Sequence, residues 1–290
     1  MLTILFDGVA YGMLLFILAV GLAVTMGLMN FINLAHGAFA MVGGYATVVL
    51  MQRFQVPFLW CLPIAFGLSA LIGALLERSL YRPMYKRPHL DQVLFSIGLT
   101  FMAVAAMDYA MGSSQQIVQL PEWLKGRTEL GDGAWMLGMG HYRLFIIAVC
   151  AALTLGLQFV LAKTRFGSRL RAAVDDQRVA AGLGINVNLV FLSTFAVGSG
   201  LAGLGGALGA EVLGLDPTFP LKFMVYFLIV VAVGGTSSIT GPLLAALLLG
   251  IADVAGKYYI PKLGAFIVYC LMIVILIWRP QGLFVRKGGK

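Results

Sequence analysis

Residues 8–52, GVAYGMLLFILAVGLAVTMGLMNFINLAHGAFAMVGGYATVVLMQ, form a 45-residue run without Asp, Glu, Lys or Arg. A helix that crosses a membrane needs about 20 apolar residues, because the hydrocarbon core is about 30 Å thick and each residue rises about 1.5 Å. The run is therefore too long for one crossing. Small and polar residues interrupt it between Met29 and Gly37. The sequence predicts two membrane helices here, at about 8–29 and 37–52.

Six further runs lack these charged residues, at 54–76, 92–107, 144–162, 179–210, 223–252 and 263–278. They are continuously apolar, whereas the strands of a membrane barrel alternate apolar and polar residues. The run 223–252 contains turn-forming residues between Gly234 and Pro242, so we expect two shorter, broken or re-entrant helices there. The predicted fold is an all-α polytopic membrane helix bundle of about nine (8–10) transmembrane helices, in a single domain over residues 1–290.

The composition agrees with a membrane protein. Hydrophobic residues make up 60% of the 290 residues and charged residues 11%, against about 45–50% and about 25% in soluble domains. So little charge excludes a soluble enzyme, a disordered chain and a nucleic-acid-binding domain. Segments 77–92, 163–187 and 279–290 hold 13 of the 20 basic residues and four acids. The positive-inside rule makes these segments cytoplasmic, with the N-terminus outside and the C-terminus inside.

The basic segment 163–187 contains signals for two short helices. Ser168 is a candidate N-cap for the first, and Asp176 for the second. Gly184 suits the left-handed position after the second helix, and Val179 and Leu183 would form its small apolar face. One interpretation is a basic loop held at the lipid headgroups. The caps and the apolar face favour the other, a cytosolic helix that docks on a partner.

Other motifs have structural interpretations. Four small residues spaced four apart predict close helix packing: Gly198, Ala202, Gly206 and Ala210. The glycine pattern G-x-G-x-x-G within this run lacks the strand that nucleotide binding requires. The sequence shows no phosphate-binding P-loop, no catalytic constellation and no metal-ligand spacing. We therefore expect a transport subunit that is not an enzyme and binds no cofactor or metal; any ATPase must be another subunit.

Polar residues inside apolar runs are candidates for function. Asn30, Asn33 and His36 are compatible with two roles, a helix break whose side chains satisfy backbone groups and a constriction on a translocation path. The carboxylates near predicted outer helix ends are expected to be solvated at the membrane interface: Asp108, Glu211, Asp216 and Asp253.

Four motifs in order then resemble a known family. They are NLAHG at 33–37, RAAVDD at 171–176 followed by GLGIN at 182–186, GG through GP at 234–242, and WRPQGLF at 278–284. Together they resemble the inner-membrane permeases of bacterial branched-chain amino acid ABC importers, over residues 5–287. The motif at 33–37 is similar to that of the shorter of the two permease subunits.

The resemblance implies a heterodimer with the longer permease, two ATPase subunits that bind ATP, and a periplasmic substrate-binding protein. It also implies that 175–185 contains the helix that couples to an ATPase, with Asp175, Asp176, Gly182 and Gly184 matching the family pattern and Arg178 beside them. Ala180 and Ala181 depart from that pattern, because an acidic residue often precedes the alanine.

The implied function is ATP-driven import of branched-chain or other apolar amino acids across the bacterial inner membrane. The binding protein would dock on the outer loops 113–142 and 209–222. A urea or short-amide ABC permease is the alternative within this class. A self-sufficient secondary carrier or channel is the alternative outside it, and a membrane-embedded enzyme is more remote.

Overall fold

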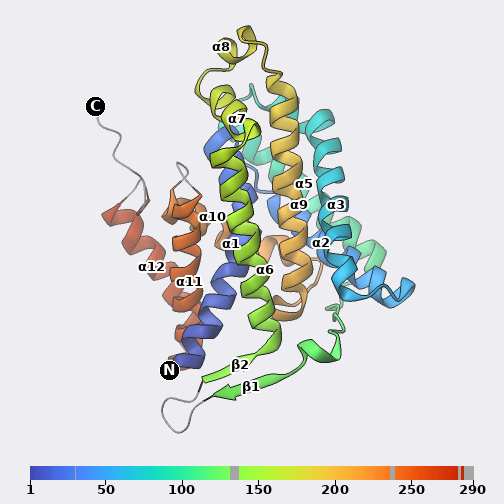
Figure 1. The fold of residues 1–290 in the computed structure, drawn as a ribbon, viewed down its shortest axis with the longest axis vertical. Coiled ribbons are helices and arrows are strands. Elements are labelled where there is room, and N and C mark those ends of the chain that lie inside the picture. Colours follow the sequence, from blue (N-terminus) through green and yellow to red (C-terminus); the bar gives the residue numbers. More distant parts are fainter. Residues whose placement is uncertain (30, 131–136, 236–238, 280–281, 284–290) are drawn as a thin grey trace.

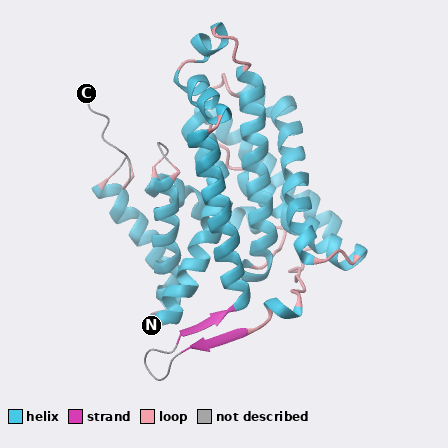
Figure 2. Ribbon diagram, in the orientation of Figure 1, coloured by secondary structure: helices cyan, strands magenta, loops and turns pink. Residues whose placement is uncertain are grey.

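The computed structural model describes residues 1–29, 31–130, 137–235, 239–279 and 282–283. It is a bundle of long helices with one small β-hairpin (Figures 1 and 2). The helices are α1 (Leu2–Met29), α2 (His36–Phe54), α3 (Phe58–Leu76), α4 (Arg82–Met84), α5 (His89–Met111), α6 (His141–Lys163), α7 (Arg165–Asp175), α8 (Gln177–Gly182), α9 (Val187–Leu213), α10 (Phe219–Gly234), α11 (Thr240–Tyr259) and α12 (Gly264–Trp278). The remaining elements are a π-helix η1 (Glu77–Tyr81), two 3₁₀ turns η2 (Glu122–Leu124) and η4 (Pro261–Leu263), and the strands β1 (Arg127–Leu130) and β2 (Leu137–Gly140).

The all-α membrane bundle expected from the sequence is confirmed. Among the described residues, six helical segments are long and apolar enough to cross a bilayer, and α10 and most of α12 form shorter apolar helices. Large apolar side chains on the outer helices, such as Leu71 and Phe159, are exposed, as lipid contact requires. The number of crossings, near nine, and the direction of the chain in the membrane stay predictions.

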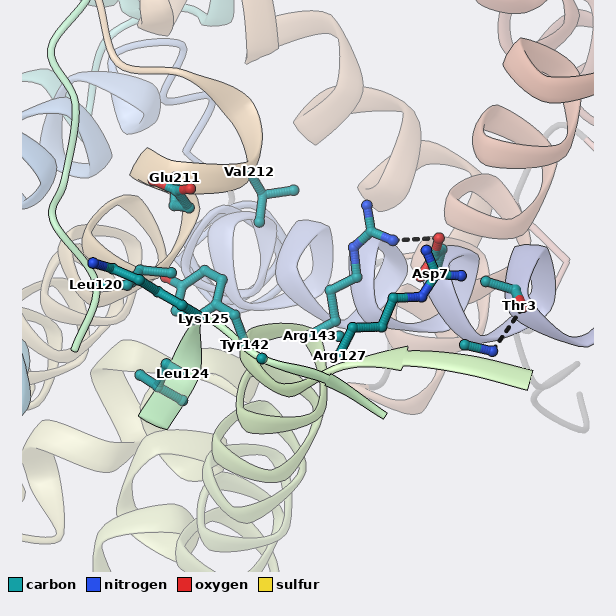
Figure 3. A pocket seen from close by; sticks show the side chains of 13 residues that line it. Thr3, Asp7, Leu120, Leu124, Lys125, Arg127, Tyr142, Arg143, Glu211 and Val212 are labelled. Carbon is teal, nitrogen blue, oxygen red and sulfur yellow. Dashed lines mark hydrogen bonds and ion pairs between the residues drawn. The ribbon is translucent and has the colours of Figure 1, made fainter. Parts of the chain in front are cut away.

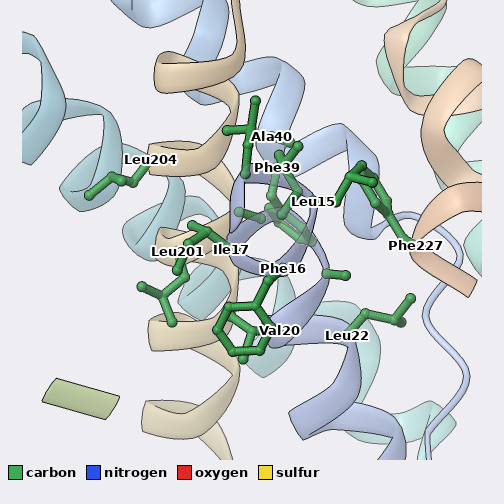
Figure 4. Packing of buried hydrophobic residues seen from close by; sticks show 14 of the residues in the cluster. Leu15, Phe16, Ile17, Val20, Leu22, Phe39, Ala40, Leu201, Leu204 and Phe227 are labelled. Carbon is green, nitrogen blue, oxygen red and sulfur yellow. The ribbon is translucent and has the colours of Figure 1, made fainter. Parts of the chain in front are cut away.

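The core of the bundle forms around α1. Its middle turns are buried on all sides, because α2, α6, α9, α10 and α11 pack around it. Figure 4 shows side chains of α1, among them Leu15, Phe16 and Val20, beside apolar residues of α2, α9 and α10. A helix that is apolar on every face suits this central position.

The basic segment 77–92, expected to connect two membrane helices as a loop, is mostly helical. The π-helix η1 continues α3, and α4 follows it to Met84. The wider π turn comes just before Pro83, whose ring would clash with the carbonyl four residues back in a regular α-helix. The long loop 113–142, for which no strands were predicted, contains the antiparallel β1–β2 hairpin.

The two ends of the bundle differ. The N-terminus and the β1–β2 hairpin lie at one end, and α8 lies at the other (Figure 1). This is the separation expected if loop 113–142 and segment 163–187 face opposite sides of the membrane. Below, these are called the hairpin end and the α8 end.

Candidate functional site

The α7 helix begins differently from the prediction. Thr164, and not Ser168, is its N-cap: Thr164 Oγ1 accepts a hydrogen bond from the Gly167 backbone N–H at 3.4 Å. Ser168 lies inside the helix, where its hydroxyl donates to the Arg165 carbonyl. Leu170 and Ala173 are buried, and α7 packs on α6 and α9. The basic segment is therefore held firmly to two long membrane helices.

The α8 helix has the caps that the sequence predicts. Asp176 Oδ1 accepts hydrogen bonds from the backbone N–H groups of Arg178 at 2.8 Å and Val179 at 3.0 Å. At the other end, Gly184 has a φ of +80°, which glycine adopts without a steric penalty. The Gly184 and Ile185 N–H groups donate to the carbonyls of Ala181 and Ala180, at 3.0 Å each. This pair of bonds is a Schellman motif, which ends the helix after 6 residues.

The apolar face of α8 points away from the protein. Ala180 is buried and fixes the helix to the bundle, whereas Val179 is 59% exposed and Leu183 75% exposed. Asp175 and Arg178 are exposed as well, and the space next to Gly182 is open. The α8 end of the bundle thus presents two uncovered apolar side chains on a short, doubly capped helix with acidic and basic neighbours.

The break between α1 and α2 is deeply buried. Asn33 Oδ1 accepts hydrogen bonds from the Ala35 backbone N–H at 3.1 Å and from the Tyr81 hydroxyl at 3.0 Å. His36 Nε2 lies 2.9 Å from the Leu18 carbonyl oxygen; a carbonyl only accepts, so this nitrogen carries a proton. These bonds support the helix-break interpretation. Asn30 lies outside the described residues.

A place for Asn33 or His36 on a translocation path stays a proposal. Both side chains are almost fully buried. Asn33 Nδ2 has no hydrogen-bond partner in the described part of the chain, so this amide has a donor left for another group.

Three buried polar residues near this break were not predicted from the sequence, and two of them bond to it directly. Gln92 Oε1 accepts from the Ile32 backbone N–H at 3.3 Å, and the Thr100 hydroxyl lies 3.4 Å from the Leu34 carbonyl. Glu77, counted among the charges of a cytoplasmic loop, is fully buried and accepts from the Tyr85 hydroxyl at 3.1 Å. The spacing of Gln92, Ser96 and Thr100, four residues apart in an apolar run, was the available signal, because it places three polar groups on one helix face.

The small residues of α9 allow close helix contact. A Cβ on Gly206 would collide with the Ala40 carbonyl of α2, and one on Gly198 would lie 3.2 Å from the Cα of Gly21 in α1. Ala202 and Ala210 are buried on the same stripe. The adjacent Gly203 meets Ser69 of α3, so the glycine-rich motif packs three helices against α9.

The four carboxylates at predicted helix ends behave differently from one another. Asp108 and Glu211 are exposed, as expected. The expectation for Asp253 is wrong: it is 1% exposed, pairs with Lys257 and lies 3.4 Å from the Tyr226 hydroxyl. Because α11 packs closely on α1 and α10, this carboxylate faces the interior, and a lysine four residues along the helix supplies its counter-charge.

Asp216 lies in the loop between α9 and α10. Burial raises the pKa of its carboxyl, but hydrogen bonds from Lys222 and Thr218 outweigh that effect and hold the pKa below the ordinary value of 3.8. Asp216 is therefore an ionised, paired carboxylate that orders the start of α10.

The described residues form two cavities of more than 400 Å³ at the hairpin end. The larger, of about 480 Å³, lies between α1, the hairpin, α6 and α9. Figure 3 shows its ion pair between Arg143 and Asp7, and the hydrogen bond from the Gly138 backbone N–H to the Thr3 hydroxyl at 3.0 Å. The smaller, of about 410 Å³, lies between α5, α10 and their adjoining loops.

The chain is similar in sequence to a known family of proteins. The family model described as "Branched-chain amino acid transport system / permease component" matches residues 4–276. No solved structure matches the chain. The high-affinity branched-chain amino acid transport system permease protein BraD of Pseudomonas aeruginosa is 26% identical, with 97% of this chain and 95% of that protein covered.

Two further relatives carry similar names. The probable branched-chain amino acid transport permease protein LivH of Methanocaldococcus jannaschii is 28% identical, over 97% of this chain and 91% of that protein. The permease protein LivM of Escherichia coli is 26% identical, over 93% of this chain but 68% of that protein. The family model covers most of the chain. The helices that are long and apolar enough to cross a membrane agree with a permease. This chain is a multi-pass membrane protein and belongs to the family of branched-chain amino acid transport system permease components.

Proposed function

We propose that this chain is the shorter permease subunit of an ABC importer of branched-chain amino acids in a bacterial inner membrane. The observation that carries the proposal is α8, a capped helix at the tip of the bundle with Val179 and Leu183 uncovered. Among relatives, the chain covers 95% of BraD and 68% of LivM, which supports the shorter subunit. Its partners are the longer permease, two ATPase subunits and a periplasmic binding protein.

The coupling role is assigned to residues 175–185. An ATPase groove takes up the apolar pair on α8, while Asp175 and Arg178 provide charged contacts beside it. When ATP closes the two ATPases, α8 moves with them. The α7 helix packs on α6 and α9, and α9 packs through glycines on α1, α2 and α3. The motion of α8 therefore reaches the middle of the bundle as a rigid-body rotation.

The energy source lies outside this chain. ATP binds to the partner subunits, and this chain acts as a transport subunit without an ATPase site of its own. The named relatives are amino acid permeases, which favours an amino acid over urea or a short amide. Membership of a transport-system family favours an assembled importer over a self-sufficient carrier.

The test is the double variant Asp176→Ala/Arg178→Ala in the complete transporter. We expect lower uptake and lower transport-coupled ATP hydrolysis, with substrate affinity of the binding protein unchanged. Normal uptake by this variant would contradict the assignment of α8 as the coupling helix.

A further inference from the structure

The smaller cavity at the hairpin end has the chemistry of a ligand site. Its volume of about 410 Å³ lies within the range of small-molecule sites, about 300–1,000 Å³. Val104 and Pro217 provide an apolar part of its wall. Asp108, Asp216 and Lys222 provide two carboxylates and one ammonium group.

The charged groups of the cavity keep hydrogen-bonding capacity for a ligand. Lys222 forms an ion pair with Asp216, yet the Lys222 side chain is 56% exposed, and an ammonium group has three N–H donors. Asp108 is exposed, and its Oδ1 accepts from the Ser113 hydroxyl at 2.8 Å. A carboxylate accepts several hydrogen bonds, so Asp108 can also accept from a ligand ammonium while Lys222 donates to a ligand carboxylate.

The wall of the cavity is held in place before any ligand arrives. The Gln116 backbone N–H donates to the Leu215 carbonyl at 2.7 Å, which joins the loop after α5 to the loop after α9. Asp216 Oδ1 accepts from the Thr218 backbone N–H at 2.8 Å. A preorganised wall lowers the entropic cost of binding.

Tyr45 of α2 adds an independent observation. Its side chain is 2% exposed, and its hydroxyl has no hydrogen-bond partner among the described residues. A buried hydroxyl without a partner is costly and calls for an explanation. Its neighbour Gly44 packs against Leu215, which directly precedes Asp216 of the cavity wall. The unpaired hydroxyl therefore lies on a helix that packs directly behind this wall.

We propose that this cavity binds the zwitterion of a free amino acid. Asp108 accepts from the α-ammonium group, Lys222 donates to the α-carboxylate, and Val104 and Pro217 contact a small apolar side chain. The site rests on the proposed function, because the cavity opens at the hairpin end, where the binding protein would release its substrate. Asp108, Lys222 and the apolar pair Val104 and Pro217 recognise the substrate here, separately from the binding protein.

The experiment measures binding of radiolabelled L-leucine to the purified complex of permease and ATPase subunits in lipid nanodiscs, without binding protein or ATP. We expect saturable leucine binding. Isoamylamine and isocaproate each lack one of the two charges of leucine, so each should displace bound leucine at least about tenfold less well than unlabelled leucine does. Asp108→Asn and Lys222→Gln should each weaken leucine binding about tenfold, because each removes one charge-assisted contact. The control is Asp91→Asn, the same change at the other end of α5, which should bind as the wild type does. Lys222→Arg, which keeps the charge and the Asp216 pair, should retain most of the binding.

Absence of saturable leucine binding to the wild-type complex would overturn the site, as would wild-type affinity in both Asp108→Asn and Lys222→Gln. Uptake driven by ATP is measured on the same complex with its binding protein. A complex that imports leucine but shows no binding at Asp108 refutes the site and leaves the proposed function standing. A complex that binds leucine but does not import it refutes the proposed function instead.

Discussion

The cap of α8 gives the most detailed prediction, for Asp176→Ala. The substitution removes both hydrogen bonds of the cap, from the N–H groups of Arg178 at 2.8 Å and Val179 at 3.0 Å. Loss of an N-cap costs about 1 kcal/mol, within about 0.5–2 kcal/mol. For a helix of 6 residues this is a large part of its local stability. The population of unfolded α8 should rise about fivefold, since about 1 kcal/mol is that factor at room temperature.

Hydrogen–deuterium exchange measures this change directly. In the assembled transporter, peptides over 177–185 of Asp176→Ala should exchange about fivefold faster, while peptides of α7 stay as in the wild type. Coupled ATP hydrolysis and uptake should fall together, because a frayed α8 transmits less of the ATPase motion. Asp176→Asn is the matched control, since Asn caps a helix as well as Asp does.

Three results would contradict the role given to the Asp176 cap. Unchanged exchange over 177–185 in Asp176→Ala would show that the cap does not stabilise α8. Faster exchange with normal uptake would show that an ordered α8 is not needed for coupling. If Asp176→Asn lost as much uptake as Asp176→Ala, the negative charge, and not the cap, would be the functional feature.

Three further substitutions test the packing, the helix break and the outer loop. Gly206→Ala should lower the melting temperature of the detergent-solubilised protein by the equivalent of about 1–3 kcal/mol, because its Cβ meets the Ala40 carbonyl; Gly156→Ala, in open space on α6, should not lower it. His36→Ala should lower the melting temperature by the equivalent of about 2–4 kcal/mol, because it removes a buried side chain and leaves the Leu18 carbonyl without its donor. An unchanged melting temperature would contradict the role of His36 in the break. Asp216 has a lowered pKa, so its stabilising effect is complete above the ordinary carboxyl pKa and is lost as the pH falls through the lower, folded-state value. The difference in melting temperature between wild type and Asp216→Asn should therefore be constant near neutral pH and shrink below about pH 4; a constant difference down to pH 2 would be the contrary result.

The sequence predicts the membrane helices well, because apolar runs of about 20 residues have few other stable structures. It also predicts the caps of α8, since Asp176 and Gly184 act through local backbone geometry that needs no tertiary contact. The direction in which a charged side chain faces is different, because only tertiary packing decides it. Asp253 and Glu77 lie at the ends of apolar runs and were assigned to the surface, yet both are buried.

The helix break shows the same limit on a smaller scale. Asn33 and His36 were found from the sequence, but their partners Tyr81 and Leu18 are 48 and 18 residues away along the chain. The N-cap of α7 was misplaced by four residues, from Thr164 to Ser168. Both residue types cap helices, and the contacts of α7 with α6 and α9 decide where this helix begins.

Leucine uptake into vesicles that contain this chain, with ATP and the partner subunits varied separately, tests the proposed function most directly. Leucine should accumulate only when the longer permease, both ATPases and the binding protein are present and ATP is supplied on the side that α8 faces. ATP on the hairpin side should give no accumulation. Leucine accumulation by vesicles that contain this chain alone, without ATP, would show that the chain is a self-sufficient carrier and not a subunit of an ABC importer.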